Sequence, residues 1–438
     1  MIKKKIHTFL ARVLMPVLMI SLPFSVPVQA GIHEINLPSE PLMGMIGLLF
    51  LFIIDFRDSS FYRFLKSPIF KISLGFLLWM FVSTLASSYP LISIKYLLVS
   101  IIHWWIFYLG VGYFLVREEH RYDQYLIWYG VSFLIIIFYS WYQHASYSFR
   151  MDASVLTARP FYYDHALYSA VMSILLFPVV GLAIHSSQKG MRWLFAVSAL
   201  LLLIGIFLSF SRAAWITLGI TLIVSLCILR WRSVRPVLVI LLVLVAGSAI
   251  ISLSSPSNNM EIQRKRNLSG QIESIFNLSS DVSNLERINR YRSGWRMFKD
   301  RPILGFGPGT FAYAYLPYQK EDEMTRLSVT SPTALDGRPH PPGKGGGAHS
   351  EYFQALAEMG TIGLLGWILL WAVSIDRCFW SWAQSNSTNH QWLVFAFGLS
   401  LIGYVILGIF NNFFHSEEVS SLCWISLAYC SACTNEPV

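Results

Sequence analysis

One histidine and a small set of arginines are the residues of this sequence best suited to chemistry. His349 stands directly before a predicted helix, and Ser350 is suited to be the N-cap of that helix. The positive end of the helix dipole disfavours a protonated imidazole, so His349 is expected to be neutral there. A neutral imidazole is suited to accept a proton, and the pattern therefore predicts a general base.

Arg212 is the second candidate because it lies between two apolar runs, near residues 192–210 and 213–230. An arginine in such a setting is costly unless it faces a cavity, binds an anion or extends to the membrane interface. Counting the predicted membrane crossings places Arg212 on the same side as His349. An anion site and a simple interfacial anchor both remain open for Arg212.

Three further arginines could complete a basic cluster. Arg287 and Arg290 fall on a predicted helix at 283–299, and Arg159 precedes a predicted span that begins near residue 165. Guanidinium groups bind phosphate through paired hydrogen bonds and could stabilise a pyrophosphate leaving group. The alternatives are a solvated helix face for Arg287 and Arg290 and an ordinary loop residue for Arg159.

Known metal and nucleotide motifs are not found in the sequence. The predicted outer loops contain no Asp-x-Asp, and no His-Glu-x-x-His or paired Cys/His spacing occurs. The glycines at 305, 307 and 309 lack a preceding strand and a βαβ unit, and there is no Walker A motif. We therefore expect a metal-independent reaction that needs no cofactor.

The composition indicates that these residues are positioned by membrane helices. Of 438 residues, 55% are hydrophobic and 13% are charged, against about 25% charged in soluble domains. The formal charge of +9 is explained by basic cytoplasmic loops, so nucleic acid is not an expected partner. The five cysteines predict no disulfide framework.

Apolar runs long enough to cross a bilayer predict an all-α polytopic membrane protein with about twelve spans. Lys3, Lys4 and Lys5 place the N-terminus in the cytoplasm, and the basic loops then alternate consistently, with the C-terminus also cytoplasmic. A cleaved signal peptide over residues 1–30 is an alternative. The predicted spans are 8–28, 42–56, 70–88, 94–116, 124–142, 165–185, 192–210, 213–230, 236–253, 359–376, 391–410 and 418–433.

This topology divides the chain into three parts. Residues 1–253 hold the first nine spans, residues 254–349 form one large, mainly helical periplasmic loop with catalytic elements, and residues 350–438 hold the last three spans. The glycine-rich connector at 302–309 and the Pro/Gly-rich stretch at 331–347 follow the predicted loop helix. The second stretch is expected to be a mobile loop that orders over a substrate.

Three motifs together resemble the bacterial O-antigen ligase family, whose superfamily also includes O-antigen polymerases and protein O-oligosaccharyltransferases. The resemblance covers most of the chain, and its specific part is residues 205–370. The motifs are Ser211-Arg212-Ala213-Ala214-Trp215, the stretch from Trp295 to Gly309, and His349-Ser350 followed by Gly360-Thr361-Ile362-Gly363.

The resemblance implies a glycosyltransferase of the bacterial inner membrane with a GT-C-like architecture and a periplasmic active site. The implied donor is an undecaprenyl-pyrophosphate-linked glycan, and the implied acceptor is a sugar hydroxyl of lipid A-core, surrounded by membrane lipids. The resemblance also implies an inverting, metal-independent reaction. By motif, His349 matches the catalytic base, while Arg212, Arg287 and Arg290 match pyrophosphate- and donor-binding positions.

Other functions remain as alternatives to the ligase. A polymerase would use the same donor with a second lipid-linked glycan as acceptor. The protein-glycosylating branch is less favoured because no further soluble domain follows the last predicted span near Cys433. A secondary transporter could also have twelve spans, but the two halves of this chain do not resemble each other.

Overall fold

The computed structural model of the protein is built almost entirely from helices. It describes residues 2–30, 33–117, 124–228, 282–325, 327–331, 347–384 and 388–433. The elements of the first half are α1 (Ile2–Phe9), η1 (Leu10–Leu14), α2 (Met15–Phe24), β1 (Val26–Ala30), β2 (His33–Leu37), α3 (Ser39–Ile53), α4 (Ser59–Leu65), α5 (Pro68–Leu85), α6 (Pro90–His103), η2 (Trp104–Gly110), α7 (Val111–Arg117), α8 (Gln124–Ser146), η3 (Met151–Val155), α9 (His165–His185), α10 (Lys189–Leu208) and α11 (Arg212–Ile228).

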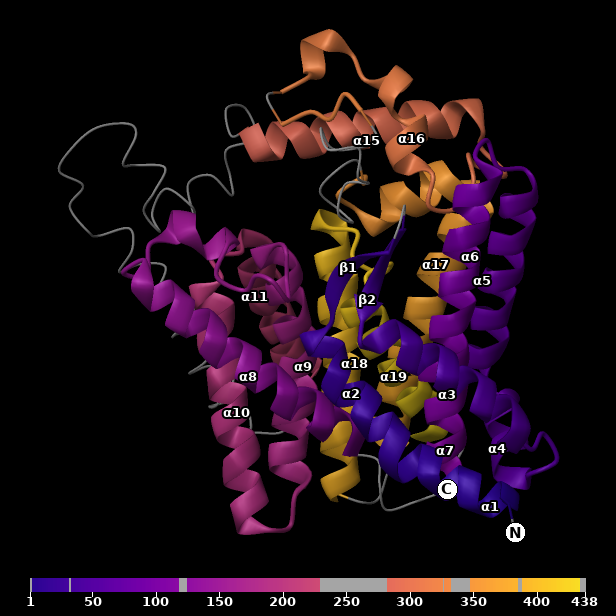
Figure 1. Ribbon diagram of the computed structural model, residues 1–438, viewed down its shortest axis with the longest axis vertical. Coiled ribbons are helices and arrows are strands. Elements are labelled where there is room, and N and C mark those ends of the chain that lie inside the picture. Colours follow the sequence, from indigo (N-terminus) through magenta and orange to yellow (C-terminus); the bar gives the residue numbers. More distant parts are fainter. Residues whose placement is uncertain are drawn as a thin grey trace.

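The second half supplies the loop helices and the last three helices of the bundle. Figure 1 shows α15 lying across one end of the bundle, whereas α1 lies at the opposite end. The elements are α15 (Val282–Asp300), α16 (Phe311–Ala314), η4 (Leu316–Tyr318), η5 (Glu321–Glu323), α17 (Glu351–Gln384), α18 (Thr388–Phe410) and α19 (Glu417–Cys433).

Eight helical stretches of the described chain are long and apolar enough to cross a membrane, and two shorter apolar helices accompany them. The chain is therefore an all-α multi-pass membrane protein. Helices occupy eleven of the twelve predicted ranges. The remaining range, 236–253, lies outside the described residues. The total of twelve spans stays a prediction. The prediction of a mobile loop falls largely on residues 332–346, which also lie outside the described residues.

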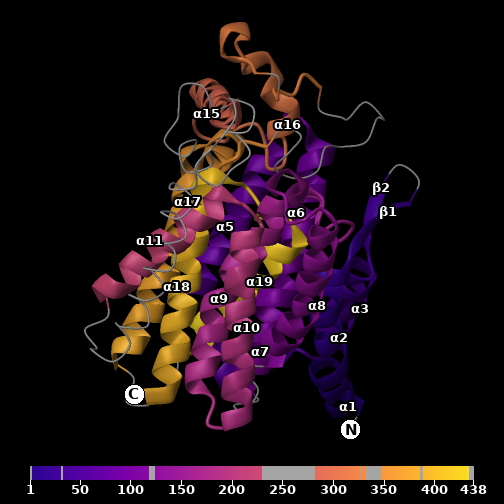
Figure 2. The same cartoon turned by 90° about the vertical axis from the view of Figure 1, so that its left-hand side faces the viewer.

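The first predicted span differs from the observed helix at both ends. Helix begins at Ile2 and ends at Phe24, and an antiparallel hairpin of β1 and β2 follows where the sequence predicted a plain loop. Val26 pairs with Leu37 in this hairpin. Figure 2 shows the hairpin at the edge of the molecule beside α2 and α3. The short strands contain Pro27, which weakens a strand signal in the sequence because proline has no N–H to donate.

Helix α19 lies at the centre of the bundle. All of its residues from Val419 to Cys433 are buried, and it packs against α9, α17 and η2. Two of its serines meet partners from the other helices: Ser431 Oγ lies 2.8 Å from Tyr108 Oη and Ser420 Oγ lies 2.9 Å from His103 Nδ1. A helix surrounded by protein can carry such serines because neighbouring helices satisfy their hydrogen bonds.

The cysteines depart from the sequence prediction. Cys378 of α17 and Cys430 of α19 form a disulfide, with their Cα atoms 5.8 Å apart. The prediction of no disulfide framework missed this bridge. It failed because the two residues are separated by 52 positions and meet only through the packing of α17 against α19.

The glycine-rich connector after α15 is locked onto a kink in α17. Gly305, Gly307 and Gly309 have φ values of +66°, +107° and +76°, and Gly360 at the kink has a φ of +68°. These values favour glycine over residues that carry a Cβ atom. A Cβ at Gly305 would collide with the backbone of Glu358, and one at Gly360 would collide with the carbonyl group of Ile303. The turn-rich connector predicted from the sequence is confirmed.

Hydrogen bonds complete this junction between connector and helix. The Gly307 N–H donates to the Glu358 carbonyl oxygen at 2.8 Å. The Glu358 carboxylate accepts from the backbone N–H groups of Gly309 at 2.8 Å and Phe311 at 2.9 Å. The loop that follows α15 is thereby held against the same helix that begins beside His349.

Candidate active site

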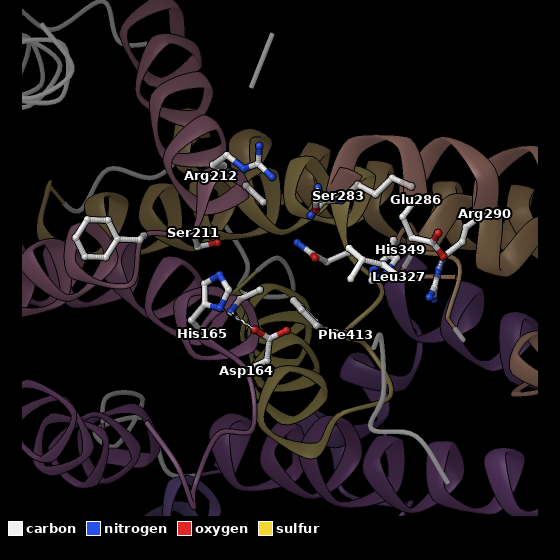
Figure 3. A pocket seen from close by; sticks show the side chains of 15 residues that line it. Asp164, His165, Ser211, Arg212, Ser283, Glu286, Arg290, Leu327, His349 and Phe413 are labelled. Carbon is white, nitrogen blue, oxygen red and sulfur yellow. Dashed lines mark hydrogen bonds and ion pairs between the residues drawn. The ribbon is translucent and has the colours of Figure 1, made fainter. Parts of the chain in front are cut away.

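A cavity of about 400 Å³ lies at the loop end of the bundle, beneath α15. Its walls come from the start of α9, the turn between α10 and α11, the first half of α15 and the turn after α18 (Figure 3). His349, just before α17, also lines it. The lining residues are Asp164, His165, Ala166, Phe210, Ser211, Arg212, Ala213, Ser283, Glu286, Arg287, Arg290, Leu327, His349, Asn411 and Phe413.

Four of the five site residues predicted from the sequence line this cavity. His349, Arg212, Arg287 and Arg290 come from three separate segments and meet there. The prediction that Arg212 and His349 lie at the same membrane face is consistent with this arrangement. Arg159 is exposed, is not among the lining residues, and donates from Nε to the Tyr163 carbonyl oxygen at 3.4 Å.

His349 is held through its backbone. Its φ of +53° is uncommon for a residue with a side chain, so partners are needed to maintain it. The His349 N–H donates to Asn412 Oδ1 at 3.1 Å, and the His349 carbonyl oxygen accepts from the Tyr291 hydroxyl at 3.2 Å. Burial raises the pKa of Tyr291 to about 12, against a smaller opposing effect of Arg287, so its hydroxyl keeps the proton that it donates.

The residues beside His349 are anchored as well. Helix α17 begins at Glu351, and the Ser350 carbonyl oxygen accepts from the Gln354 N–H at 2.9 Å, as expected at the start of a helix. The Gln354 side-chain oxygen accepts from the Ala348 N–H at 2.8 Å and from Asn412 Nδ2 at 3.2 Å. Both neighbours of His349 in sequence are thus fixed relative to α17.

Arg290 is engaged by protein groups in the wall of the cavity. Its side chain is 1% exposed, and its Nε lies 2.9 Å from Glu286 Oε1. Its Nη1 donates to the Gly347 carbonyl oxygen at 2.6 Å. The second oxygen of Glu286 accepts from the hydroxyl groups of Thr325 and Ser328. Arg290 therefore ties α15 to the segment that leads into His349.

Arg212 and Arg287 are half-buried in the cavity wall. Arg212 is the first residue of α11, after a tight turn in which Phe210 has a φ of +52°. The positive end of the helix dipole and the guanidinium group act together there to favour an anion. Arg287 donates to the Phe410 carbonyl oxygen at 3.4 Å and to Ser283 Oγ at 3.3 Å, which fixes it beside the turn after α18.

Comparison with known families bears on this geometry. Residues 197–368 match a family model described as O-antigen ligase. This segment of the chain is similar to that family. No curated protein matches the chain. The family resemblance seen in the sequence is confirmed, and the family implies a glycosyltransferase-like enzyme of lipopolysaccharide assembly that uses lipid-linked glycans.

The segment that matches the family model supplies most of the predicted site. The matched residues include Arg212, Arg287, Arg290 and His349, while Arg159 lies outside them. Other walls of the cavity come from helices before and after this segment, such as α9 and the turn after α18. The spans that flank the segment therefore complete its cavity.

Asn411, His165 and Asp164 are among the lining residues to which the sequence assigned no role in the site. Asn411 is 5% exposed, and its Nδ2 has no hydrogen-bond partner within the described part of the chain. His165 Nδ1 lies 3.0 Å from Asp164 Oδ1, and Asp164 also caps α9 by accepting from the Ala166 N–H at 3.1 Å. The sequence did offer signals for these residues. Asn411 and Asn412 are consecutive asparagines between apolar runs, and Asp164 and His165 stand directly before another apolar run.

The described residues contain no group of three or more His, Cys, Asp or Glu side chains that could hold a metal ion. The cavity instead presents guanidinium groups, which can bind phosphate oxygens directly. Independence from metal stays a prediction from the sequence.

Proposed function

We propose that this protein is an O-antigen ligase of the bacterial inner membrane. It would transfer a glycan from undecaprenyl pyrophosphate to a sugar hydroxyl of lipid A-core. The observation that carries the proposal is the meeting of His349 with Arg212 and Arg287 in one cavity at the loop end of the bundle. A candidate base and two candidate phosphate-binding groups are the elements that this reaction needs.

In this proposal the donor pyrophosphate binds to Arg212 and Arg287. Both side chains line the cavity, and Arg212 adds the N-terminus of α11. Asn411 donates a hydrogen bond from Nδ2 to the lipid-linked glycan. This buried N–H group otherwise lacks a hydrogen-bond partner among the described residues. Arg290 shapes the site through Glu286 and Gly347, and Arg159 has no role in this proposal because it is exposed and is not among the lining residues.

The reaction is a single inverting displacement. His349 accepts the proton of the acceptor hydroxyl as that oxygen forms a bond to the anomeric carbon. The bond from the anomeric carbon to the pyrophosphate oxygen breaks, and its electron pair leaves with undecaprenyl pyrophosphate. Arg212 and Arg287 stabilise the charge that develops on this leaving group, a role that a metal ion would otherwise serve.

The proposed orientation places the cavity in the periplasm and both chain ends in the cytoplasm. The cavity lies at the end of the bundle that α15 covers, and α1, which carries Lys3, Lys4 and Lys5, lies at the other end (Figure 1). Basic residues favour the cytoplasmic side of a bacterial membrane. This distribution supports the orientation that the loops predict.

The test is a transfer assay with purified protein, a lipid-linked glycan donor and lipid A-core in the presence of EDTA. Wild type should produce a glycan ladder on lipid A-core, and His349→Ala should reduce the rate by about 10²- to 10⁴-fold. His185→Ala, at the far end of α9, is the matched control and should retain activity.

Other results of the same assay would contradict the proposal. Elongated lipid-linked glycan without product on lipid A-core would indicate a polymerase. Absence of transfer to either acceptor would favour a transporter. Full activity of a folded His349→Ala protein would refute the role of His349, and loss of activity in EDTA that added metal restores would refute metal independence.

A further inference from the structure

A second cavity of about 660 Å³ lies beside α15, on the flank that faces the start of α17. It is defined here as the α15/α17 groove. Aromatic and aliphatic side chains form its walls, and basic side chains form much of its rim. Its lining residues are Tyr291, Arg292, Trp295, Arg296, Lys299, Glu323, Tyr352, Phe353, Leu356 and Leu364.

The rim of the groove carries more positive than negative charge. Glu323 is its one carboxylate and lies 2.6 Å from Arg296 Nη2 and 3.3 Å from Arg292 Nη1. The Arg292 side chain is 59% exposed, so much of its guanidinium group remains accessible beside Glu323. Lys299 is also exposed. The surplus charge suits an anionic ligand, and Arg292 and Lys299 are the cations best placed to meet it.

The floor of the groove continues into the apolar surface of α17. Leu364 lines the groove, and Ile368, one turn further along the same helix, is 42% exposed. The adjacent Leu365 is 57% exposed. Because α17 is long and apolar enough to cross a membrane, these side chains are suited to contact acyl chains. The groove thus joins a basic rim to a surface that faces lipid.

The groove is also close to the candidate base. The ring of Tyr291 lines the groove and stacks on Phe353 with a centroid distance of 4.7 Å. The hydroxyl of the same tyrosine donates to the His349 carbonyl oxygen at 3.2 Å. One side chain therefore separates the groove from the backbone of His349.

We propose that the α15/α17 groove binds the phosphorylated lipid anchor of the acceptor. A phosphate group lies against Arg292 and Lys299, and an acyl chain lies along Trp295 and the apolar side of α17. This inference rests on the proposed ligase function, which needs two membrane-anchored substrates. The donor pyrophosphate is assigned to the cavity of Arg212 and Arg287, so the acceptor needs a separate approach to His349.

The first experiment measures binding in the absence of donor. Purified full-length protein in detergent is titrated with diphosphoryl lipid A, and bound lipid is counted by native mass spectrometry. Arg292→Gln/Lys299→Gln should weaken binding by about tenfold or more, the loss expected for one charge-assisted hydrogen bond. Trp295→Ala should also weaken it, whereas Lys320→Gln, an exposed cation outside the groove lining, should not.

The second experiment separates acceptor binding from chemistry. In the transfer assay, Arg292→Gln/Lys299→Gln should raise the KM for lipid A-core while the KM for the donor and kcat at saturating acceptor stay unchanged. A purely structural defect would lower kcat or the thermal stability instead. Arg292→Lys/Lys299→Arg retains both charges and should restore most of the affinity.

Three results would overturn the inference. Unchanged lipid A binding in the double variant would remove the groove as the site. If the double variant loses phosphatidylglycerol binding to the same extent and its KM for lipid A-core is unchanged, the groove is a general lipid contact. Competition by inorganic phosphate at equal concentration would make it a simple anion site. If wild type binds lipid A through these residues but transfers no glycan, the ligase assignment fails while the lipid site stands.

Discussion

The backbone N–H of His349 donates to the side-chain oxygen of Asn412 across 63 positions of sequence, at 3.1 Å. This bond joins the start of α17 to the turn between α18 and α19. It holds His349 at a φ of +53°, which a histidine seldom adopts without support. The backbone of His349 is therefore held by a residue that takes no part in the proposed chemistry itself.

Removal of this support should reduce catalysis more than stability. Asn412→Ala deletes the acceptor for the His349 N–H, and we expect kcat to fall about tenfold, because one backbone hydrogen bond then no longer holds the strained conformation. The KM for the donor should change little. Steady-state kinetics together with a thermal unfolding curve check this expectation, and unchanged kcat in a folded protein would show that Asn412 does not position His349.

Replacement of Arg212 should distinguish forked phosphate binding from charge alone. Arg212→Ala should lower kcat/KM for the donor by about 10²-fold or more, the usual cost of losing one group that stabilises developing charge. Arg212→Lys keeps the charge but loses the paired hydrogen bonds, so an intermediate loss is expected. Arg159→Ala is the control, since Arg159 is exposed and outside the cavity lining. Equal activity of Arg212→Ala and wild type would leave Arg212 as an interfacial anchor.

The buried pair of Arg290 and Glu286 should behave as a structural unit. Arg290→Met leaves the carboxylate of Glu286 buried without its cation, which typically costs about 3–5 kcal/mol. Glu286→Gln/Arg290→Met removes both charges and should recover part of that loss. Thermal unfolding of the three proteins in the same detergent measures the difference. A double variant that is less stable than Arg290→Met would contradict this account.

The kink at Gly360 should tolerate no Cβ atom. Gly360→Ala forces alanine to a φ of +68° and against the carbonyl group of Ile303, so we expect a loss above about 1 kcal/mol and a displaced connector. Gly75→Ala in α5 is the matched control, because nothing lies within 4 Å of the added atom. Limited proteolysis and thermal unfolding compare the two. Similar effects of both changes would argue against a close contact between the connector and the kink at Gly360.

Acid should loosen the contact between η5 and α15. Although burial raises the pKa of Glu323, the guanidinium groups of Arg296 and Arg292 hold that pKa below its ordinary value of about 4.5. The native pKa is depressed, so the stabilisation from Glu323 is fully present above about pH 4.5 and is lost as the pH falls through the native pKa. The stability difference between wild type and Glu323→Gln should therefore shrink below that pH. A constant difference down to pH 3 would contradict the prediction.

The sequence by itself determined the class of the protein, most of its helices and the identity of its main polar residues. Long apolar runs specify membrane helices because each segment must satisfy its own backbone hydrogen bonds in lipid. Arg212 could be selected because a charged group between apolar runs is costly and needs a reason. Arg287 and Arg290 could be selected as phosphate-binding groups on a predicted loop helix, and His349 by its place before a predicted helix. These are local properties, and a local pattern is enough to show them.

Only the tertiary structure decided which residues meet. Asn411 and Asn412 had no assigned role until the turn after α18 was placed against the start of α17. Arg159 was a candidate for the basic cluster, but it is not among the residues that line the cavity. The disulfide between Cys378 and Cys430 was missed for the same reason. Contacts between membrane helices depend on the fit of side chains from distant segments, which no single apolar run encodes.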